Sequence, residues 1–281
     1  MSLVYNGRMS AVQLSASTLK IFQECPRCFW LHITRRIERP RGPFPSLPSG
    51  IDRVLKGYFD VYRKAGRLPP LIDGKLPGTL ATSALTLGFT DPGVQARLWG
   101  KLDDCVILPD RRVAPLDHKT RASAPDGVGY TEKYYQFQMD VYTLLLERNG
   151  QRTSRTAYVV YYCPVDGELH LGFPFQVTIH TIATDPDRAY GVFTDACRCL
   201  AGPLPDSGER CEFCRWAEAR QARLPARPAR LPEEQARLAA RPARLPARPA
   251  HLAARQARGL PMPQAATPPP VSSAIPDDLF A

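Results

Sequence analysis

The centre of the chain reads Gly100-Lys-Leu-Asp-Asp-Cys-Val-Ile-Leu108 and, after a short gap, Val113-Ala-Pro-Leu-Asp-His-Lys-Thr120. Both segments are rich in β-branched and apolar residues, and the Pro109-Asp-Arg-Arg112 sequence between them is typical of a turn. We expect Arg97–Leu108 to form one strand and the second segment to return beside it. The sequence therefore predicts an antiparallel hairpin at the centre of the fold.

The predicted hairpin gathers acidic and basic side chains. Alternate residues of a strand share a face, so Asp117 and Lys119 should point the same way, and pairing should bring Asp103 beside Asp117. Two neighbouring carboxylates repel each other unless a cation lies between them. Mg²⁺ or Mn²⁺ suits such a pair, because these hard cations take one or two carboxylates together with phosphate oxygens. Lys119 would then stabilise charge on a phosphate or hold the attacking water.

Helices and strands alternate around this hairpin. Apolar residues recur at three- and four-residue spacing in three segments that we expect to be helices: Ile51–Lys64, Tyr134–Arg148 and Asp187–Leu200. The Thr156–Cys163 segment is a continuous apolar and aromatic run, as expected for a strand buried on both faces. One or two further strands should follow between His170 and Ile182, and residues 11–35 should be helical with a break at Pro26. The pattern predicts a mixed α/β core.

Four motifs, in this order and approximate spacing, resemble those of RecB-like nucleases of the PD-(D/E)XK superfamily. They are the Ser-x-Ser-x-x-x-x-Phe-x-x-Cys-Pro stretch within residues 15–31, Gly100-x-x-Asp103, Asp117-x-Lys119 and Gln138-x-x-x-Tyr142. The resemblance spans about residues 13–216. It implies an α/β fold of the restriction-endonuclease-like kind, a mixed sheet flanked by helices, carrying here a Cys metal staple and a disordered C-terminal tail.

The resemblance also implies roles for individual residues. Asp103 and Asp117 would bind the metal, Lys119 would be catalytic, and Gln138 and Tyr142 would lie on one helical face alongside the site and the DNA. The family usually adds a metal-binding His a few residues after a Gly on an early helix. No His follows Gly50 before His118, so we expect Asp52, and less readily Asp60, to take that role. The alternative is that Asp52 is simply an acidic residue near a helix N-terminus.

Two Cys-x-x-Cys pairs, Cys25–Cys28 and Cys211–Cys214, lie near the two ends of the expected domain. Four thiolates in this pattern predict a zinc site or a four-iron four-sulfur cluster that ties the two segments together, as in related iron–sulfur nucleases. Those relatives commonly use one N-terminal and three C-terminal Cys, so zinc remains open. Buried structural thiols are the other interpretation. Cys197 or Cys199 could replace one ligand, whereas Cys105 and Cys163 fit core positions.

The C-terminal part of the chain differs in composition. The sequence Arg-Leu-Pro-Ala-Arg-Pro-Ala occurs at 223–229 and again at 244–250, and repeated prolines exclude a continuous helix. We expect residues 1–220 to form the nuclease-like domain and residues 221–281 to be a disordered basic tail. The tail holds nine Arg and four acidic residues, so it contributes +5 to the net charge of +10. A basic balance of this size favours a polyanionic partner such as nucleic acid.

These observations predict a metal-dependent DNA nuclease, with single-strand or end preference, acting in DNA repair, recombination or defence beside a helicase or recombination protein. Residues 1–8 have no apolar signal segment and no stretch is long enough to cross a membrane, so we expect a cytoplasmic location and no membrane partner. Two alternatives remain: a catalytically inactive DNA-binding module with the same fold, and a zinc-stapled scaffold protein.

Overall fold

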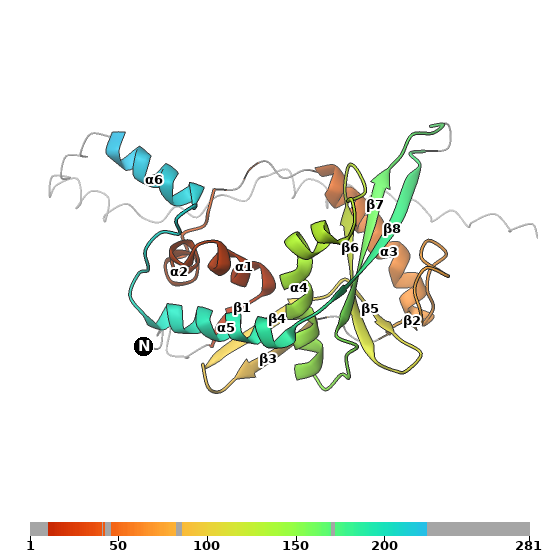
Figure 1. The fold of residues 1–281 in the computed structure, drawn as a ribbon, viewed down its shortest axis with the longest axis horizontal. Coiled ribbons are helices and arrows are strands. Elements are labelled where there is room, and N and C mark those ends of the chain that lie inside the picture. The colour runs from red at the N-terminus through yellow and green to blue at the C-terminus, as the bar shows by residue number, and fades with distance from the viewer. Residues whose placement is uncertain (1–10, 41, 43–45, 83–85, 170–171, 224–281) are drawn as a thin grey trace, which may run out of the picture. The chain divides into compact units, whose positions relative to one another are not determined.

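The computed structural model describes residues 11–40, 42, 46–82, 86–169 and 172–223 (Figure 1). The six helices in these ranges are α1 (Ala16–Glu24), α2 (Pro26–Arg35), α3 (Ser46–Lys64), α4 (Val128–Arg148), α5 (Pro186–Ala201) and α6 (Glu212–Arg223). The helix α6 crosses the domain boundary expected at residue 220. The rest of the predicted tail lies outside the described residues.

A five-stranded mixed sheet forms the centre of the domain. Its strand order is β2 (Thr79–Leu80), β5 (Asp104–Ile107), β6 (Val113–Thr120), β7 (Thr156–Pro164) and β8 (Phe175–Ala183). The strands β6 and β7 are parallel, and the other neighbours are antiparallel. The β5–β6 pair is the hairpin that the sequence predicted, and it pairs Asp104 with Leu116.

Helices cover both faces of this sheet, so the core has three layers (Figure 1). Along β7, Val159 and Tyr161 pack in a cluster with α4 residues such as Leu145, whereas Tyr158 and Val160 pack on the other face with Phe59 of α3. Every residue from Ala157 to Cys163 is buried. This confirms the predicted strand buried on both faces and the predicted mixed α/β core.

A second sheet of three strands lies beside α4 and α5, in the order β1 (Val12–Leu14), β4 (Ala96–Lys101) and β3 (Thr86–Asp91). Here one prediction was wrong, because the continuous strand expected over 97–108 is two strands in different sheets. The chain leaves β4 after Lys101 and enters β5 at Asp104. In β4 only alternate residues are buried, whereas in β5 Asp104, Cys105 and Val106 are all buried. The two parts of the expected strand therefore have different surroundings.

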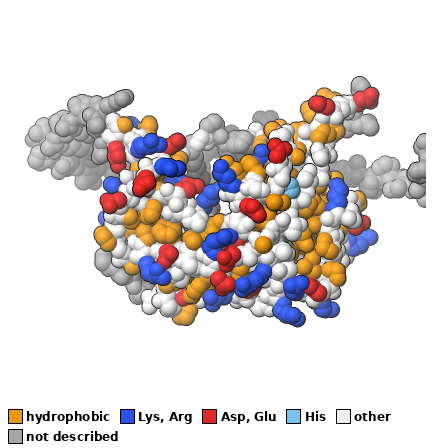
Figure 2. Space-filling model, viewed as in Figure 1, with side chains coloured by type: hydrophobic (Ala, Val, Ile, Leu, Met, Phe, Trp, Pro, Cys, Tyr) orange, Lys and Arg blue, Asp and Glu red, His pale blue; other side chains and the backbone are white. Residues whose placement is uncertain are grey.

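The N-terminal helical stretch breaks where the sequence indicated. The Cys25 backbone is extended and caps α2, and Pro26 occupies the first turn of that helix, where its missing N–H is not needed. None of the helices in the described ranges is long and apolar enough to span a bilayer. Figure 2 shows basic and acidic side chains interspersed over the face in view, which fits the modest charge excess of the domain.

Candidate active site and metal centre

Asp117 lies on β6 with its carboxylate facing α4, and its side chain is only 1% exposed. Gln138 of α4 donates a hydrogen bond of 3.0 Å from Nε2 to Asp117 Oδ1. The Lys119 ammonium is in ion-pair contact with the buried Oδ2. Burial raises the pKa of Asp117 and the charge of Asp103 adds to the rise, while Lys119 acts in the opposite direction.

Asp103 lies in the short break between β4 and β5. Its Oδ2 accepts a hydrogen bond of 3.2 Å from the backbone N–H of His118, the residue after Asp117. The bend therefore presents the second carboxylate to the strand that carries the first. Gly100 allows this close packing, because a Cβ at that position would lie 2.9 Å from Leu145 Cδ1 of α4. This contact gives a steric reason for the glycine of the Gly-x-x-Asp motif.

Gln138 and Tyr142 both reach the site from one face of α4. Besides Asp117, Gln138 Nε2 donates to the Tyr142 hydroxyl at 2.8 Å, and Tyr142 donates to the Lys101 carbonyl at 3.3 Å. Lys119 Nζ lies 3.5 Å from Gln138 Oε1. Burial raises the pKa of Tyr142, so its hydroxyl stays protonated. The predicted residues Asp117, Lys119, Gln138 and Tyr142 are therefore brought together in one hydrogen-bonded group.

The helix α3 contributes charges from the other side of Asp103. Lys56 Nζ lies 2.8 Å from Asp52 Oδ2 and 3.7 Å from Asp103 Oδ1, so one ammonium links these carboxylates. Asp60 instead pairs with Arg63. Asp52 therefore lies near Asp103, but Asp52, Asp103 and Asp117 do not form a compact three-ligand group in the described part of the chain. Sequence reasoning missed Lys56, because an Asp and a Lys four residues apart on a helix usually form an ordinary surface pair.

His118 faces the opposite side of β6, as alternation along the strand predicts. Its Nε2 lies 3.1 Å from Asp104 Oδ2, and its Nδ1 lies 3.0 Å from the Tyr162 hydroxyl. Arg63 of α3 donates a bond of 2.7 Å to the other oxygen of Asp104 and a further bond to the Asp103 carbonyl. This buried network holds the bend on the side of β6 opposite Asp117. No local sequence pattern predicts it, because its members come from four different elements.

The donor set around Asp117 fits a hard divalent cation. Two carboxylates adjoin, and one of them, Asp117, is fully buried and in ion-pair contact with Lys119. A hard divalent cation takes one or two carboxylates together with phosphate oxygens. Asp117 and Asp103 are the residues that could hold Mg²⁺ or Mn²⁺ here.

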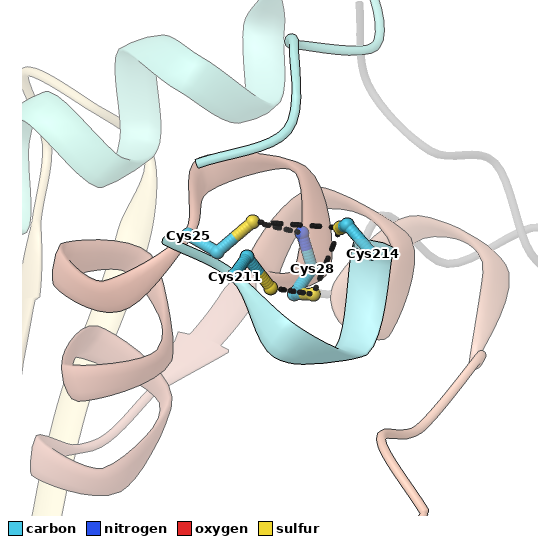
Figure 3. A group of neighbouring side chains, drawn as sticks. All are labelled: Cys25, Cys28, Cys211 and Cys214. Carbon is cyan, nitrogen blue, oxygen red and sulfur yellow. Dashed lines mark hydrogen bonds between the residues drawn. The ribbon is translucent and has the colours of Figure 1, made fainter. Parts of the chain in front are cut away.

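The four predicted metal-binding cysteines meet in a separate buried group, the Cys cluster (Cys25, Cys28, Cys211 and Cys214), shown in Figure 3. Their Sγ atoms all lie within 4.8 Å of one another. The Cys25–Cys214 distance is 3.8 Å, and Cys28 lies 3.6 Å from both Cys211 and Cys214. Each pair stands at the start of a helix, α2 or α6, so the cluster joins residues near the two ends of the domain.

The surroundings of the Cys cluster favour thiolate at one position. Burial opposes ionisation of Cys25, but backbone N–H groups of Cys28 and Gly208, at 3.5 and 3.3 Å from its Sγ, outweigh burial and lower its pKa to about 7. Burial and the neighbouring sulfurs raise the pKa of Cys214. Four thiolates therefore need a bound cation to coexist.

The remaining cysteines lie apart from this cluster. Cys105 and Cys163 are buried in the core, as expected. Cys197 and Cys199 lie on α5 and belong to no metal-capable group among the residues that the structure describes. The two-plus-two pairing of the sequence motifs is thus the arrangement found.

Comparison with known proteins places these features in a family. The crystal structure of SSO0001 is 14% identical, with a TM-score of 0.42, over 76% of this chain and 88% of that chain. No curated protein matches the sequence. The family model of the PD-(D/E)XK nuclease superfamily matches residues 73–221, more than half of the 281-residue chain. This range includes Asp103, Asp117, Lys119, Gln138 and Tyr142. The chain therefore belongs to the PD-(D/E)XK nuclease superfamily.

Proposed function

We propose that the protein is a metal-dependent nuclease that hydrolyses DNA phosphodiester bonds at the group formed by Asp103, Asp117 and Lys119. The observation that carries this proposal is the fully buried carboxylate of Asp117, which is in contact with Lys119 and close enough to Asp103 for that charge to raise its pKa. A structural ion pair with Lys119 needs only one carboxylate, whereas Mg²⁺ takes one or two carboxylates together with phosphate oxygens.

Each residue has a defined task in this proposal. Asp103 and Asp117 hold Mg²⁺ or Mn²⁺, and Asp52 assists from α3. A bound ion of this kind supplies a nucleophilic water at neutral pH and offsets charge on the phosphate. Lys119 stabilises charge that develops on the phosphate oxygens, because Asp117 and Gln138 hold its ammonium at the site. Gln138 and Tyr142 keep the Asp117 carboxylate in place.

For the Cys cluster we propose a single structural zinc ion. Zinc bound by four thiolates is tetrahedral with Zn–S distances of about 2.3 Å, which places the sulfurs about 3.8 Å apart. The Sγ distances of 3.6 to 3.8 Å support this assignment. A four-iron four-sulfur cluster places four irons between its thiolates and so needs them farther apart. Purified protein that is brown and contains iron and sulfide would overturn the zinc assignment.

The finer functional assignments follow from the RecB-like resemblance of the motifs. We propose a cytoplasmic enzyme with single-strand or end preference that acts in DNA repair, recombination or defence with a helicase or recombination protein. The arginine-rich segment from residue 221 onward supports DNA as the partner, because such segments bind phosphates without sequence preference.

Cleavage assays test the central proposal. The full-length protein should cleave single-stranded or duplex DNA when Mg²⁺ or Mn²⁺ is added, and chelation of these ions should stop cleavage. Lys119→Ala should lose activity, whereas Lys64→Ala, which truncates an exposed lysine on α3, should retain it. Full activity of Lys119→Ala would contradict the proposal.

One observation favours a second candidate, a DNA-binding module without catalysis. Lys56 already pairs with Asp52 and contacts Asp103, so an ammonium competes for the carboxylates that would hold the metal. Tight DNA binding without cleavage under any of these metal conditions would support that module.

A further inference from the structure

A group of tyrosines extends from the catalytic lysine along α4. Tyr130, Tyr134 and Tyr135 form this group, which we call the tyrosine platform. The Tyr130 ring lies 4.5 Å from Tyr134 and 6.3 Å from Tyr135, measured between centroids. Lys119 Nζ lies 4.9 Å from the centroid of Tyr135, so the platform begins at the proposed catalytic centre.

Cations accompany each ring of the platform. The Arg121 guanidinium lies 3.9 Å from the Tyr130 centroid, and Lys133 Nζ lies 5.3 Å from that of Tyr134. Together with Lys119, three positive charges therefore alternate with three aromatic rings. No carboxylate of a described residue forms an ion pair with Arg121 or Lys133, so their charges are available to a ligand.

The platform tyrosines differ from the structural tyrosines of the same domain. Tyr142, Tyr161 and Tyr162 are buried, and each of their hydroxyls is hydrogen-bonded. In the described part of the chain the hydroxyls of the three platform tyrosines make no hydrogen bond, and Tyr134 is 44% exposed. The protein therefore leaves these hydroxyls without partners among the described residues and exposes the ring of Tyr134.

The spacing of the platform continues the motif that reaches the active site. Tyr130, Tyr134, Gln138 and Tyr142 follow one another at intervals of four residues, so each is a neighbour of the next on the surface of α4. From Tyr130 to Gln138 the helix rises about 12 Å. A strand bound to the rings would therefore end near Lys119, which lies against Tyr135.

We propose that the tyrosine platform binds unpaired bases of a DNA strand and feeds that strand into the active site. This inference rests on the proposed nuclease function and assigns the single-strand preference to particular residues. Tyr134 is exposed and Tyr130 and Tyr135 are half-buried beside it. Accessible aromatic rings stack on bases of any sequence, and neighbouring cations contact the backbone phosphates. Paired bases within a duplex are stacked on each other, so their faces are not accessible to the tyrosines.

The test is a binding experiment in buffer without added divalent cations, which avoids cleavage and leaves the Cys cluster intact. Anisotropy of fluorescein-labelled dT20 and of a 20-base-pair duplex would be measured for the full-length protein and for Tyr134→Leu and Tyr134→Phe. Loss of one stacking ring should weaken dT20 binding by about 5- to 150-fold. Duplex binding should change little, and Tyr134→Phe should bind like the unmodified protein.

The control variant is Phe173→Leu, which removes a 74% exposed ring from the β7–β8 connection. It should leave binding of both DNAs unchanged. Equal affinity of Tyr134→Leu and the unmodified protein for dT20, or an equal loss in Tyr134→Phe and Tyr134→Leu, would overturn the platform. Selective binding of a 20-residue RNA strand in place of dT20 would also overturn it.

Failure of the nuclease proposal is detected separately. Absence of cleavage with Mg²⁺ or Mn²⁺, combined with tyrosine-dependent binding of dT20, would retain the platform and reject the catalytic assignment. Cleavage by a protein whose dT20 affinity does not depend on Tyr134 would retain the catalytic assignment and reject the platform.

Discussion

Removing one ligand of the Cys cluster should lower metal content and stability together. Cys25 and Cys214 are 189 residues apart in sequence, so the cluster closes a loop that includes most of the domain. For a cross-link over a loop of this size, the chain-entropy relation gives a stabilisation of about 5 kcal/mol. A domain of this length shifts its unfolding temperature by about 2–4 °C per kcal/mol, so Cys214→Ser should lower it by about 10 to 20 °C.

Thermal unfolding followed by far-UV circular dichroism, together with zinc analysis per polypeptide, would measure both effects. The matched control is Cys199→Ser, the same substitution on α5 outside the Cys cluster. It should keep the zinc and unfold within a few degrees of the unmodified protein. Metal-free wild-type protein of undiminished stability, or a Cys214→Ser protein that loses zinc without losing stability, would refute the reasoning.

Further expected outcomes concern catalysis, pH, metal affinity and the tail. Lys119→Ala should reduce the cleavage rate by about 10² to 10³-fold with an unchanged circular dichroism spectrum, since a positioned electrostatic contact is lost; a smaller loss in single-turnover assays would contradict this role. Burial lowers the pKa of His180 below its ordinary 6.5, so its neutral form stabilises the fold above that pH and this contribution is lost as the pH falls. The difference in urea midpoint between pH 7.5 and pH 5 should therefore shrink in His180→Gln, and an unchanged difference would exclude His180 as its source. Lys56→Ala should raise Mn²⁺ affinity several-fold, seen as a lower midpoint in thermal-shift titrations, because one competing cation leaves Asp52 and Asp103. Deleting residues 224–281 should leave cleavage of short DNA intact and flatten the salt dependence of binding to long DNA; superimposable salt titrations would show that this segment is not a DNA arm.

Local sequence patterns predicted much of the fold. Apolar and β-branched composition and the turn at Pro109 predicted the β5–β6 hairpin, and helical spacing predicted α3, α4 and α5. The division between β4 and β5 could not be predicted, because a bend at Asp103 changes the sheet partner without changing the local residue types. The three-residue strand β1 has too short a pattern to be recognised and depends on its distant partner β4.

The same distinction holds for the candidate site. Spacing predicted that Asp117 and Lys119 share a strand face and that Gln138 and Tyr142 share a helix face, and the family resemblance implied that the two pairs would meet. Contacts that depend on packing between elements, such as Lys56 with Asp103 or His118 with Asp104, had no sequence signal. The tyrosine platform was visible only once the Arg121 and Lys119 side chains could be placed over its rings.

The parallel pairing of β6 and β7 has a consequence for how the active site is encoded in the chain. Parallel neighbours need a crossover connection, and α4 is that crossover. The connection that allows the two strands to pair is therefore also the helix that carries the tyrosine platform and Gln138. As a result, most of the site lies within one continuous segment, residues 100–142. A circular permutant opened in the β7–β8 connection should keep this segment whole, whereas one opened between Arg121 and Val128 would separate the proposed catalytic lysine from its DNA-binding helix.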